Sequence, residues 1–151
     1  MAAYLLDTNV VLRLIDRNDP DHTLCQQAVE RLIQQQHEPC LAPQVLVEFW
    51  VVATRPMENN GFGWSPVETN RHLDDLCRLF RLLPEPRALF DRWRQMVVAR
   101  KVHGKRAHDA RLAAFMVLHG IANVLTLNPR DFNGFGVTVV EPAQLANEGA
   151  P

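Results

Sequence analysis

Short apolar runs alternate with longer segments of helical periodicity along this chain of 151 residues. Five runs have the length and composition of buried strands, at residues 3–6, 40–42, 79–82, 123–126 and 137–140. Strands that alternate with helices predict an α/β fold with a short, mostly parallel central sheet, covered by helices on both faces. We expect a single domain over residues 1–151, with a flexible tail at about 143–151.

The segments between these runs predict helices from their spacing of apolar residues and from their end signals. Predicted helices cover residues 10–15, 19–36, 43–54, 66–78, 87–100 and 108–120. Asp19 before Pro20 has the form of an N-cap, and Ser65 with Glu68 has the form of a capping box. Residues 55–66 are rich in Pro and Gly and predict a loop within the domain.

Composition excludes several classes of protein. The chain has 47% apolar and 22% charged residues, which is ordinary for a globular domain, and no stretch approaches the roughly 20 apolar residues of a membrane span. The first six residues lack the features of a secretory signal, so a cytoplasmic location is expected. Cys25, Cys40 and Cys77 lack metal-ligand spacing and are expected to be reduced, packed thiols. A net charge of −1 excludes bulk electrostatic coating of nucleic acid, so any such contact must be local.

Two carboxylates stand in apolar surroundings. Asp7 is the only charged residue between Met1 and Leu12, and it falls where the first strand should end, the edge at which open parallel sheets bind ligands. Glu48 is the only charged residue in residues 41–54, within an apolar helix. A buried carboxylate needs compensation by an arginine or a metal ion. The alternatives are an N-cap role for Asp7 and, for Glu48, a structural ion pair or an exposed position.

Two further acids also have ordinary structural explanations. Asp109 is expected in the first turn of its helix, where the macrodipole favours an acid by roughly 0.3–1 kcal/mol. Asp131 follows Asn128, Pro129 and Arg130, a sequence typical of a turn. The four acids taken together are more informative than each acid alone, because all four can converge at one edge of a parallel sheet.

A cluster of four carboxylates predicts a divalent cation. Neighbouring carboxylates raise one another's pKa, so a cluster that stays ionised near neutral pH calls for a positive charge. Ligands that are all oxygen favour Mg²⁺ or Mn²⁺ over zinc. Such an ion lowers the pKa of bound water and neutralises charge on a phosphoryl oxygen. Phosphodiester hydrolysis is therefore the predicted reaction class.

Four motifs carry a resemblance to a known family. They are L-L-D-T-N-V at residues 5–10, V-E-F at 47–49, H-D-A-R-L-A-A at 108–114 and L-T-L-N-P-R-D-F at 125–132. In this order they resemble the motifs of PIN domains, and specifically those of VapC-type toxin ribonucleases from bacterial toxin–antitoxin pairs. The resemblance spans essentially the whole chain.

The resemblance implies roles for particular residues. Asp7, Glu48 and Asp109 correspond to an acidic triad that binds Mg²⁺ or Mn²⁺ and positions the attacking water. Asp131 corresponds to a fourth acidic position that varies in such proteins, and Asn128 could supply a neutral oxygen in its place. The polar residues at positions that orient the carboxylates are Thr8, Asn9 and Thr126.

Cationic side chains precede Asp109 in the sequence. Together with Arg100, the residues Lys101, His103, Lys105 and Arg106 form a predicted basic loop, a candidate clamp for RNA phosphates. Arg130 is a further candidate on the opposite side of the acids. A solvated charged loop is the alternative explanation.

The expected function is that of an endoribonuclease which cleaves RNA with metal-activated water. The resemblance implies 3′-hydroxyl and 5′-phosphate products, a homodimer, and neutralisation by a cognate antitoxin that lies in a groove near the active site. One alternative is an inactive PIN-like module that binds RNA or a partner and need not bind Mn²⁺. The other is a phosphohydrolase of small phosphate esters, but haloacid-dehalogenase-like enzymes carry a second Asp where this chain has Asn9.

Overall fold

Strand β1 (Ala3–Leu6) is the central strand of a five-stranded sheet in the computed structural model, which describes residues 1–147. The other strands are β2 (Glu38–Leu41), β3 (Arg81–Leu82), β4 (Asn123–Leu125) and β5 (Thr138–Val140). Their order is β3-β2-β1-β4-β5, and every neighbouring pair is parallel. The predicted α/β fold with a parallel sheet is confirmed.

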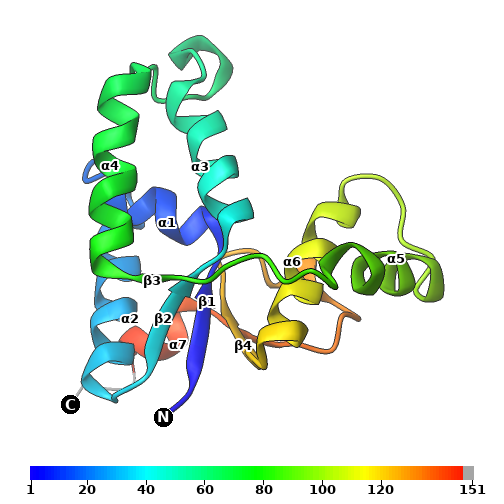
Figure 1. Ribbon diagram of the computed structural model, residues 1–151. Helices are drawn as coiled ribbons and strands as arrows, with labels where there is room; N and C mark the ends of the chain where they lie inside the picture. Colours follow the sequence, from blue (N-terminus) through cyan, green and yellow to red (C-terminus); the bar gives the residue numbers. More distant parts are fainter. Residues whose placement is uncertain (148–151) are drawn as a thin grey trace.

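Seven helices and two 3₁₀ turns surround the sheet. They are α1 (Thr8–Ile15), α2 (His22–Gln34), α3 (Pro43–Thr54), α4 (Pro66–Leu79), α5 (Leu89–Ala99), α6 (Arg106–His119) and α7 (Pro142–Asn147), with η1 (Met57–Asn59) and η2 (Pro129–Phe132). In Figure 1, α1 to α4 lie on one side of β1 and β2, and α5 and α6 lie on the other. Helices therefore cover both faces, as predicted.

The order in which strands are added to the sheet changes direction at β1. From β1 the chain runs outward through β2 to β3, and it then returns to place β4 on the other side of β1. Reversal points of this kind leave a crevice beyond the carboxyl ends of the two strands. Asp7 and Thr126 follow β1 and β4 directly, and their amides continue the sheet by donating to Leu125 O and Val140 O, each over 3.0 Å. The fold thus brings residues 7 and 126 to one edge.

Several local signals act as predicted. The N–H of Glu68 donates to Ser65 Oγ over 3.1 Å at the start of α4, as in a capping box. Helix α3 begins at Pro43, where the missing proline N–H has no cost. Helix α6 ends at Gly120, whose φ of 69° lies in the left-handed region that glycine adopts without strain.

Other boundaries differ from the predictions, each for an identifiable reason. Helix α2 begins at His22 because Asp19 Oδ1 accepts from the N–H of Asp21 over 2.8 Å and so holds a turn before the helix. Helix α4 continues to Leu79, which shortens the predicted strand at 79–82 to β3. The strand predicted at 40–42 covers Glu38–Leu41 instead.

The expected flexible tail is helical over most of its described part. Residues 143–147 belong to α7, whose Leu145 is buried and which packs against α2. Residues 148–151 lie outside the described part of the chain. Residues 143–147 are thus part of a packed helix where a tail was expected, and this helix depends on a contact that is distant in sequence.

Two of the three cysteine thiols are buried, as predicted. Cys25 and Cys40 are buried and free, and burial raises the pKa of each to about 11, so both are inert. Cys77 is free but exposed on α4, which corrects the expectation that it is packed. No helix within residues 1–147 has the length and apolar character needed to cross a membrane.

Candidate functional site

Asp7 occupies the crevice between β1 and β4 and is almost completely buried, with 8% of its surface exposed. Its Oδ1 accepts from the N–H of Thr8 over 2.8 Å, so it also caps α1. Its Oδ2 accepts from Thr126 Oγ1 over 2.7 Å and from Asn9 Nδ2 over 3.3 Å. Burial raises the Asp7 pKa to about 6, against the effect of the hydrogen bonds from Thr126 and Thr8. The predicted N-cap role and a place in an acidic site therefore coincide.

The Thr126 hydroxyl is oriented by its other partners. It accepts from Asn9 Nδ2 over 3.1 Å and from the N–H of Asn128 over 3.0 Å. A hydroxyl has one hydrogen and two lone pairs. Two donors occupy the lone pairs, so the hydrogen must point to Asp7. The Asn9 side chain is fixed in turn, because its Oδ1 accepts from the N–H of Leu127 over 3.1 Å.

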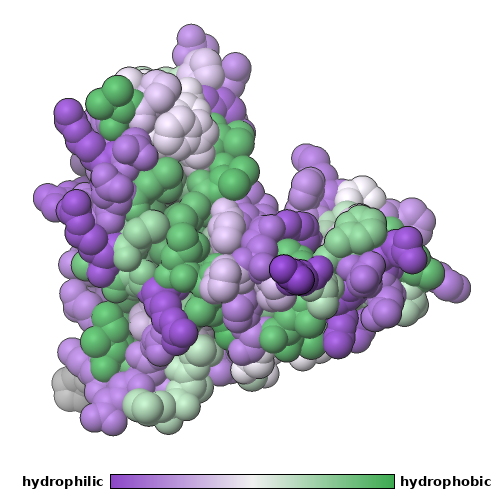
Figure 2. Space-filling model, in the orientation of Figure 1, coloured by the Kyte–Doolittle hydropathy of each residue, from purple (hydrophilic) through white to green (hydrophobic). Residues whose placement is uncertain are grey.

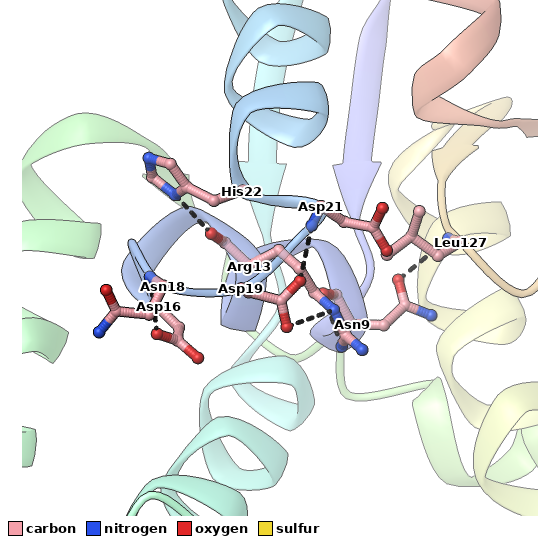
Figure 3. A network of polar contacts seen from close by, with 8 residues as sticks. All are labelled: Asn9, Arg13, Asp16, Asn18, Asp19, Asp21, His22 and Leu127. Atoms are coloured by element: carbon pink, nitrogen blue, oxygen red, sulfur yellow. Dashed lines mark hydrogen bonds and ion pairs between the residues drawn. The ribbon is translucent and has the colours of Figure 1, made fainter.

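A polar network along α1 and the turn before α2 includes Asn9 (Figure 3). Arg13 Nη1 donates to the Asn9 carbonyl over 3.2 Å, and Arg13 Nε lies 3.6 Å from Asp19 Oδ2. His22 Nδ1 lies 2.8 Å from the Arg13 carbonyl. The turn before α2 is therefore tied to the helix that carries Asn9, which makes the base of the site rigid.

Glu48 lies on α3 and faces Asp7 across Thr8. Its Oε2 accepts from Thr8 Oγ1 over 2.5 Å, and its Oε1 accepts from Gln44 Nε2 over 3.0 Å. The two partners are a hydroxyl and an amide, whereas a structural ion pair would need an arginine or lysine. Thr8 thus joins two of the four acids, since its N–H binds Asp7 and its hydroxyl binds Glu48.

Asp109 and Asp131 complete the acidic group. Asp109 lies in the first turn of α6, and Asp131 lies in η2 after β4. Partial burial raises the Asp109 pKa to about 7, with repulsion from Asp131, Asp7 and Glu48 adding to it and Arg106 opposing it. Glu48 and Asp131 also raise the pKa of Asp7. The structure therefore brings all four predicted acids into electrostatic reach of one another.

The donor chemistry of this cluster fits a hard cation, although the ligands are not yet gathered. As the side chains lie, no three acidic, histidine or cysteine residues within 1–147 form a ready metal-binding group. Asp7 and Glu48 are held by hydrogen bonds, whereas the Asp109 and Asp131 side chains make none within the described chain. The oxygen atoms of these carboxylates are nevertheless the ligand type that Mg²⁺ and Mn²⁺ prefer. Asn128 is exposed and contributes its N–H to Thr126.

The predicted basic loop is shorter than expected. Helix α6 begins at Arg106, so the loop ends at Lys105. Arg106 is fixed, because its Nη2 donates to the Asn133 carbonyl over 2.6 Å and its guanidinium lies 4.8 Å from the centre of the Phe135 ring. The remaining candidates for RNA contact are all exposed, and they are Lys101, His103, Lys105 and Arg130.

Sequence reasoning missed three residues beside Glu48. Gln44 lies one helical turn before Glu48 and contacts Arg111, which forms an ion pair with Glu85 over 2.9 Å. These residues line a hollow of about 490 Å³ next to Glu48, together with Val47 and His108. The only signal in the sequence is the four-residue spacing of Gln44 and Glu48, which places both on one face of α3.

The fold and the site together define a parallel α/β domain with an acidic centre at its topological switch point. Residues 4–136 match the PIN domain family, and the chain belongs to that family. The comparison with curated proteins found no match.

Solved structures of toxin–antitoxin proteins share the fold. VapBC2 from Rickettsia felis, bound to a promoter DNA fragment, matches with a TM-score of 0.69 and 12% identity, covering 92% of this chain and 98% of that chain. DNA-bound VapBC from Salmonella typhimurium matches with a TM-score of 0.67 and 21% identity, covering 94% and 99%. VapC20 from Mycobacterium tuberculosis, a toxin that cleaves the sarcin-ricin loop, matches with a TM-score of 0.58 and 19% identity. The match covers 80% of this chain and 86% of that chain. At these identities the similarity concerns the fold alone.

Proposed function

We propose that this protein is an endoribonuclease that depends on Mg²⁺ or Mn²⁺ and hydrolyses RNA phosphodiester bonds in the cytoplasm. The observation that carries the proposal is the meeting of four carboxylates, from the ends of β1 and β4 and from α3 and α6, around one crevice. The PIN fold is typical of nucleases. A merely structural acid would be expected to form an ion pair with a cationic side chain, and the Asp109 and Asp131 side chains form none within residues 1–147.

In this proposal the four acids hold the cation. Asp7 and Glu48 would hold it with carboxylates that are fixed by hydrogen bonds, and Asp109 and Asp131 would add the other two carboxylates. When bound, the cation would lower the pKa of a coordinated water and neutralise charge on the scissile phosphate. Near neutral pH the proton on Asp109 must leave as the cation binds, because its pKa is raised to about 7.

The distribution of charge supports an RNA substrate. Residues 85–111 contain eight Lys or Arg and three Asp or Glu, a net charge of +5, although the whole chain carries −1. This segment includes α5, the start of α6 and the exposed Lys101 and Lys105. A local positive surface beside an acidic centre suits a polyanion whose backbone must approach carboxylates.

The biological role we propose is that of the toxin in a type II toxin–antitoxin pair. The support is the likeness in fold to VapC and FitB proteins, which were crystallised within VapBC and FitAB complexes. The protein would be inhibited by a cognate antitoxin. Expression of the wild type alone should arrest growth, and coexpression with the product of an adjacent short gene should relieve the arrest.

We also propose a homodimer. Figure 2 shows apolar side chains gathered over α3 and α4. Val47 and Val51, one turn apart on α3, are 64% and 52% exposed, and apolar side chains in such a position favour burial against a second copy. Light scattering on the Val51→Glu variant should report a monomer where the wild type is a dimer.

The decisive experiment is an RNA cleavage assay with defined ends. A 5′-labelled RNA should be cut in Mn²⁺ or Mg²⁺ to leave 3′-hydroxyl and 5′-phosphate ends, and EDTA should abolish cutting. Asp7→Asn should eliminate cleavage and keep the fold, whereas the control Asp74→Asn, at an exposed position on α4, should cut normally. Full activity of Asp7→Asn would refute the assignment.

The same assay separates the other candidate functions. Mn²⁺ binding without cleavage of any RNA would leave a module that binds but does not cut. Release of phosphate from small esters, with RNA intact, would indicate a phosphohydrolase.

A further inference from the structure

The Gln44 side chain has a partner for each of its polar groups. Its Nε2 donates to Glu48 Oε1 over 3.0 Å and to the His108 carbonyl over 2.9 Å. Its Oε1 accepts from Arg111 Nη1 over 3.0 Å. Three contacts to three different residues fix this amide far more firmly than a surface glutamine.

The partners also fix which way the amide points. In the opposite orientation the amide oxygen would face a carboxylate oxygen and a carbonyl oxygen, both of which only accept. Its NH₂ group would face a guanidinium, which only donates. The observed orientation is therefore the only one that makes these three hydrogen bonds.

The amide links the two helices that carry Glu48 and Asp109. Glu48 lies one turn after Gln44 on α3, and the His108 carbonyl directly precedes Asp109 in the first turn of α6. Helix α3 packs mainly against α1 and α4. Gln44 is thus a direct polar link between the helix that carries Glu48 and the turn that carries Asp109.

Arg111 supports this link from the outer side. Its Nη2 donates to Glu85 Oε1 over 2.9 Å, and its Nη1 holds the Gln44 oxygen. The resulting chain runs from Glu85 through Arg111 and Gln44 to Glu48. Each residue in this chain has a defined role as donor or acceptor. Replacement of one residue should therefore leave the next without one of its hydrogen-bond partners.

We infer that Gln44 is a positioning residue that sets the Glu48 carboxylate relative to Asp109, with Arg111 holding Gln44 in place. The inference rests on the proposed metal-dependent nuclease. Partners of metal ligands that act in this way typically change metal affinity or activity by about 10- to 100-fold when removed.

The test compares Gln44→Met, which keeps the length of the side chain but cannot hydrogen-bond, with Gln27→Met at an exposed position on α2. Titration calorimetry with Mn²⁺ alone should show affinity reduced roughly tenfold in Gln44→Met and unchanged in Gln27→Met. With RNA, kcat should fall while KM stays within about twofold, because Gln44 is not expected to touch the substrate.

A double-mutant cycle with Arg111→Met tests the chain itself. Arg111→Met alone should weaken Mn²⁺ binding, and the change should largely disappear when Gln44 is already Met. Additive effects would show that Arg111 acts independently of Gln44 and would overturn that part of the inference.

Crystal structures of the wild type and Gln44→Met without metal provide a readout that does not depend on catalysis. A displaced Glu48 carboxylate in the variant supports the inference, and an unmoved one overturns it. Equal Mn²⁺ affinity in both proteins would overturn the positioning role while leaving the nuclease proposal intact. A wild type that binds no Mn²⁺ would instead refute the proposed function, and the position of Glu48 would still decide the role of Gln44.

Discussion

The Thr126 hydroxyl donates to Asp7 Oδ2 over 2.7 Å, although the two residues are 119 positions apart in the sequence. The contact exists because β1 and β4 are neighbours in the sheet and both end at the same edge. It joins the first and the last motif of the chain beside β1, where the order of strands in the sheet changes direction. Both groups are buried, so the loss of this bond cannot be made good by water.

Replacement of Thr126 by Val should destabilise the protein and raise the pKa of Asp7 above its value of about 6, since the hydrogen bond that lowers it is lost. A buried hydrogen bond that leaves its partner unsatisfied costs about 1–3 kcal/mol. Urea denaturation should show this loss in Thr126→Val. The control Thr138→Val, at an exposed position in β5, should stay within about 0.5 kcal/mol of the wild type. Equal stability of the two variants would contradict the role of Thr126.

Without a divalent cation, the stability of the fold should fall as pH rises from about 4 to about 7 and change little above that. The Asp109 pKa of about 7 in the folded protein exceeds the ordinary pKa of an aspartate, 3.8. Between these values the folded state holds a proton that the unfolded state has released, so deprotonation disfavours folding. Asp109→Asn removes this effect and should be more stable than the wild type at pH 8, by up to a few kcal/mol, with little difference near pH 4. Thermal unfolding of both proteins in EDTA at the two pH values measures this difference in stability. The same difference at pH 4 and at pH 8 would contradict the raised pKa of Asp109.

A divalent cation should stabilise the protein more at pH 8 than at pH 5.5. Protons compete with the ion for Asp7 and Asp109, whose pKa values are raised to about 6 and about 7. At a concentration 100-fold above Kd, binding to the folded state adds about 2.7 kcal/mol. The rise in Tm with Mn²⁺ should therefore shrink at the lower pH and be lost in Asp7→Asn. A rise that is independent of pH would point to a site elsewhere on the protein.

The sequence was sufficient to predict the acids for a physical reason. Asp7 and Glu48 are single charges within apolar segments, and a charge in such a place needs an explanation from the three-dimensional structure. The parallel order of strands then predicts that acids following different strands meet at one edge. Asp131 was predictable in the same way, since it follows the run that forms β4.

The residues that support the acids were harder to predict. Gln44 is a polar residue in the first turn of α3, and one of its two partners on α6 is a backbone carbonyl, which has no signature in the sequence. Helix α7 escaped prediction because Leu145 packs against α2, more than a hundred residues earlier in the chain. The start of α2 was misplaced because Asp19 is used in a turn and in an ion pair with Arg13, and both compete with its use as a cap.

The loop before α6 should bind RNA by charge alone. Lys101 and Lys105 are exposed, and their side chains make no hydrogen bond or ion pair within the described chain, so both ammonium groups can reach phosphates. On single strands each phosphate contact contributes about 0.7 to the slope of log K against log salt concentration. The double variant Lys101→Gln, Lys105→Gln should therefore lower this slope by about 1.4 and weaken binding of all RNA sequences to a similar extent. Fluorescence anisotropy between 50 and about 200 mM salt measures the slope.

A matched control tests whether the position of the charge matters as well as its sign. Arg17 is exposed in the connection between α1 and α2, and α1 and α2 lie on the opposite side of β1 and β2 from α5 and α6 (Figure 1). Arg17→Gln should leave the slope unchanged, although it also removes one positive charge. An equal drop in slope for Arg17→Gln and for a single lysine variant would mean that RNA responds only to net charge. In that case the loop before α6 has no special part in binding.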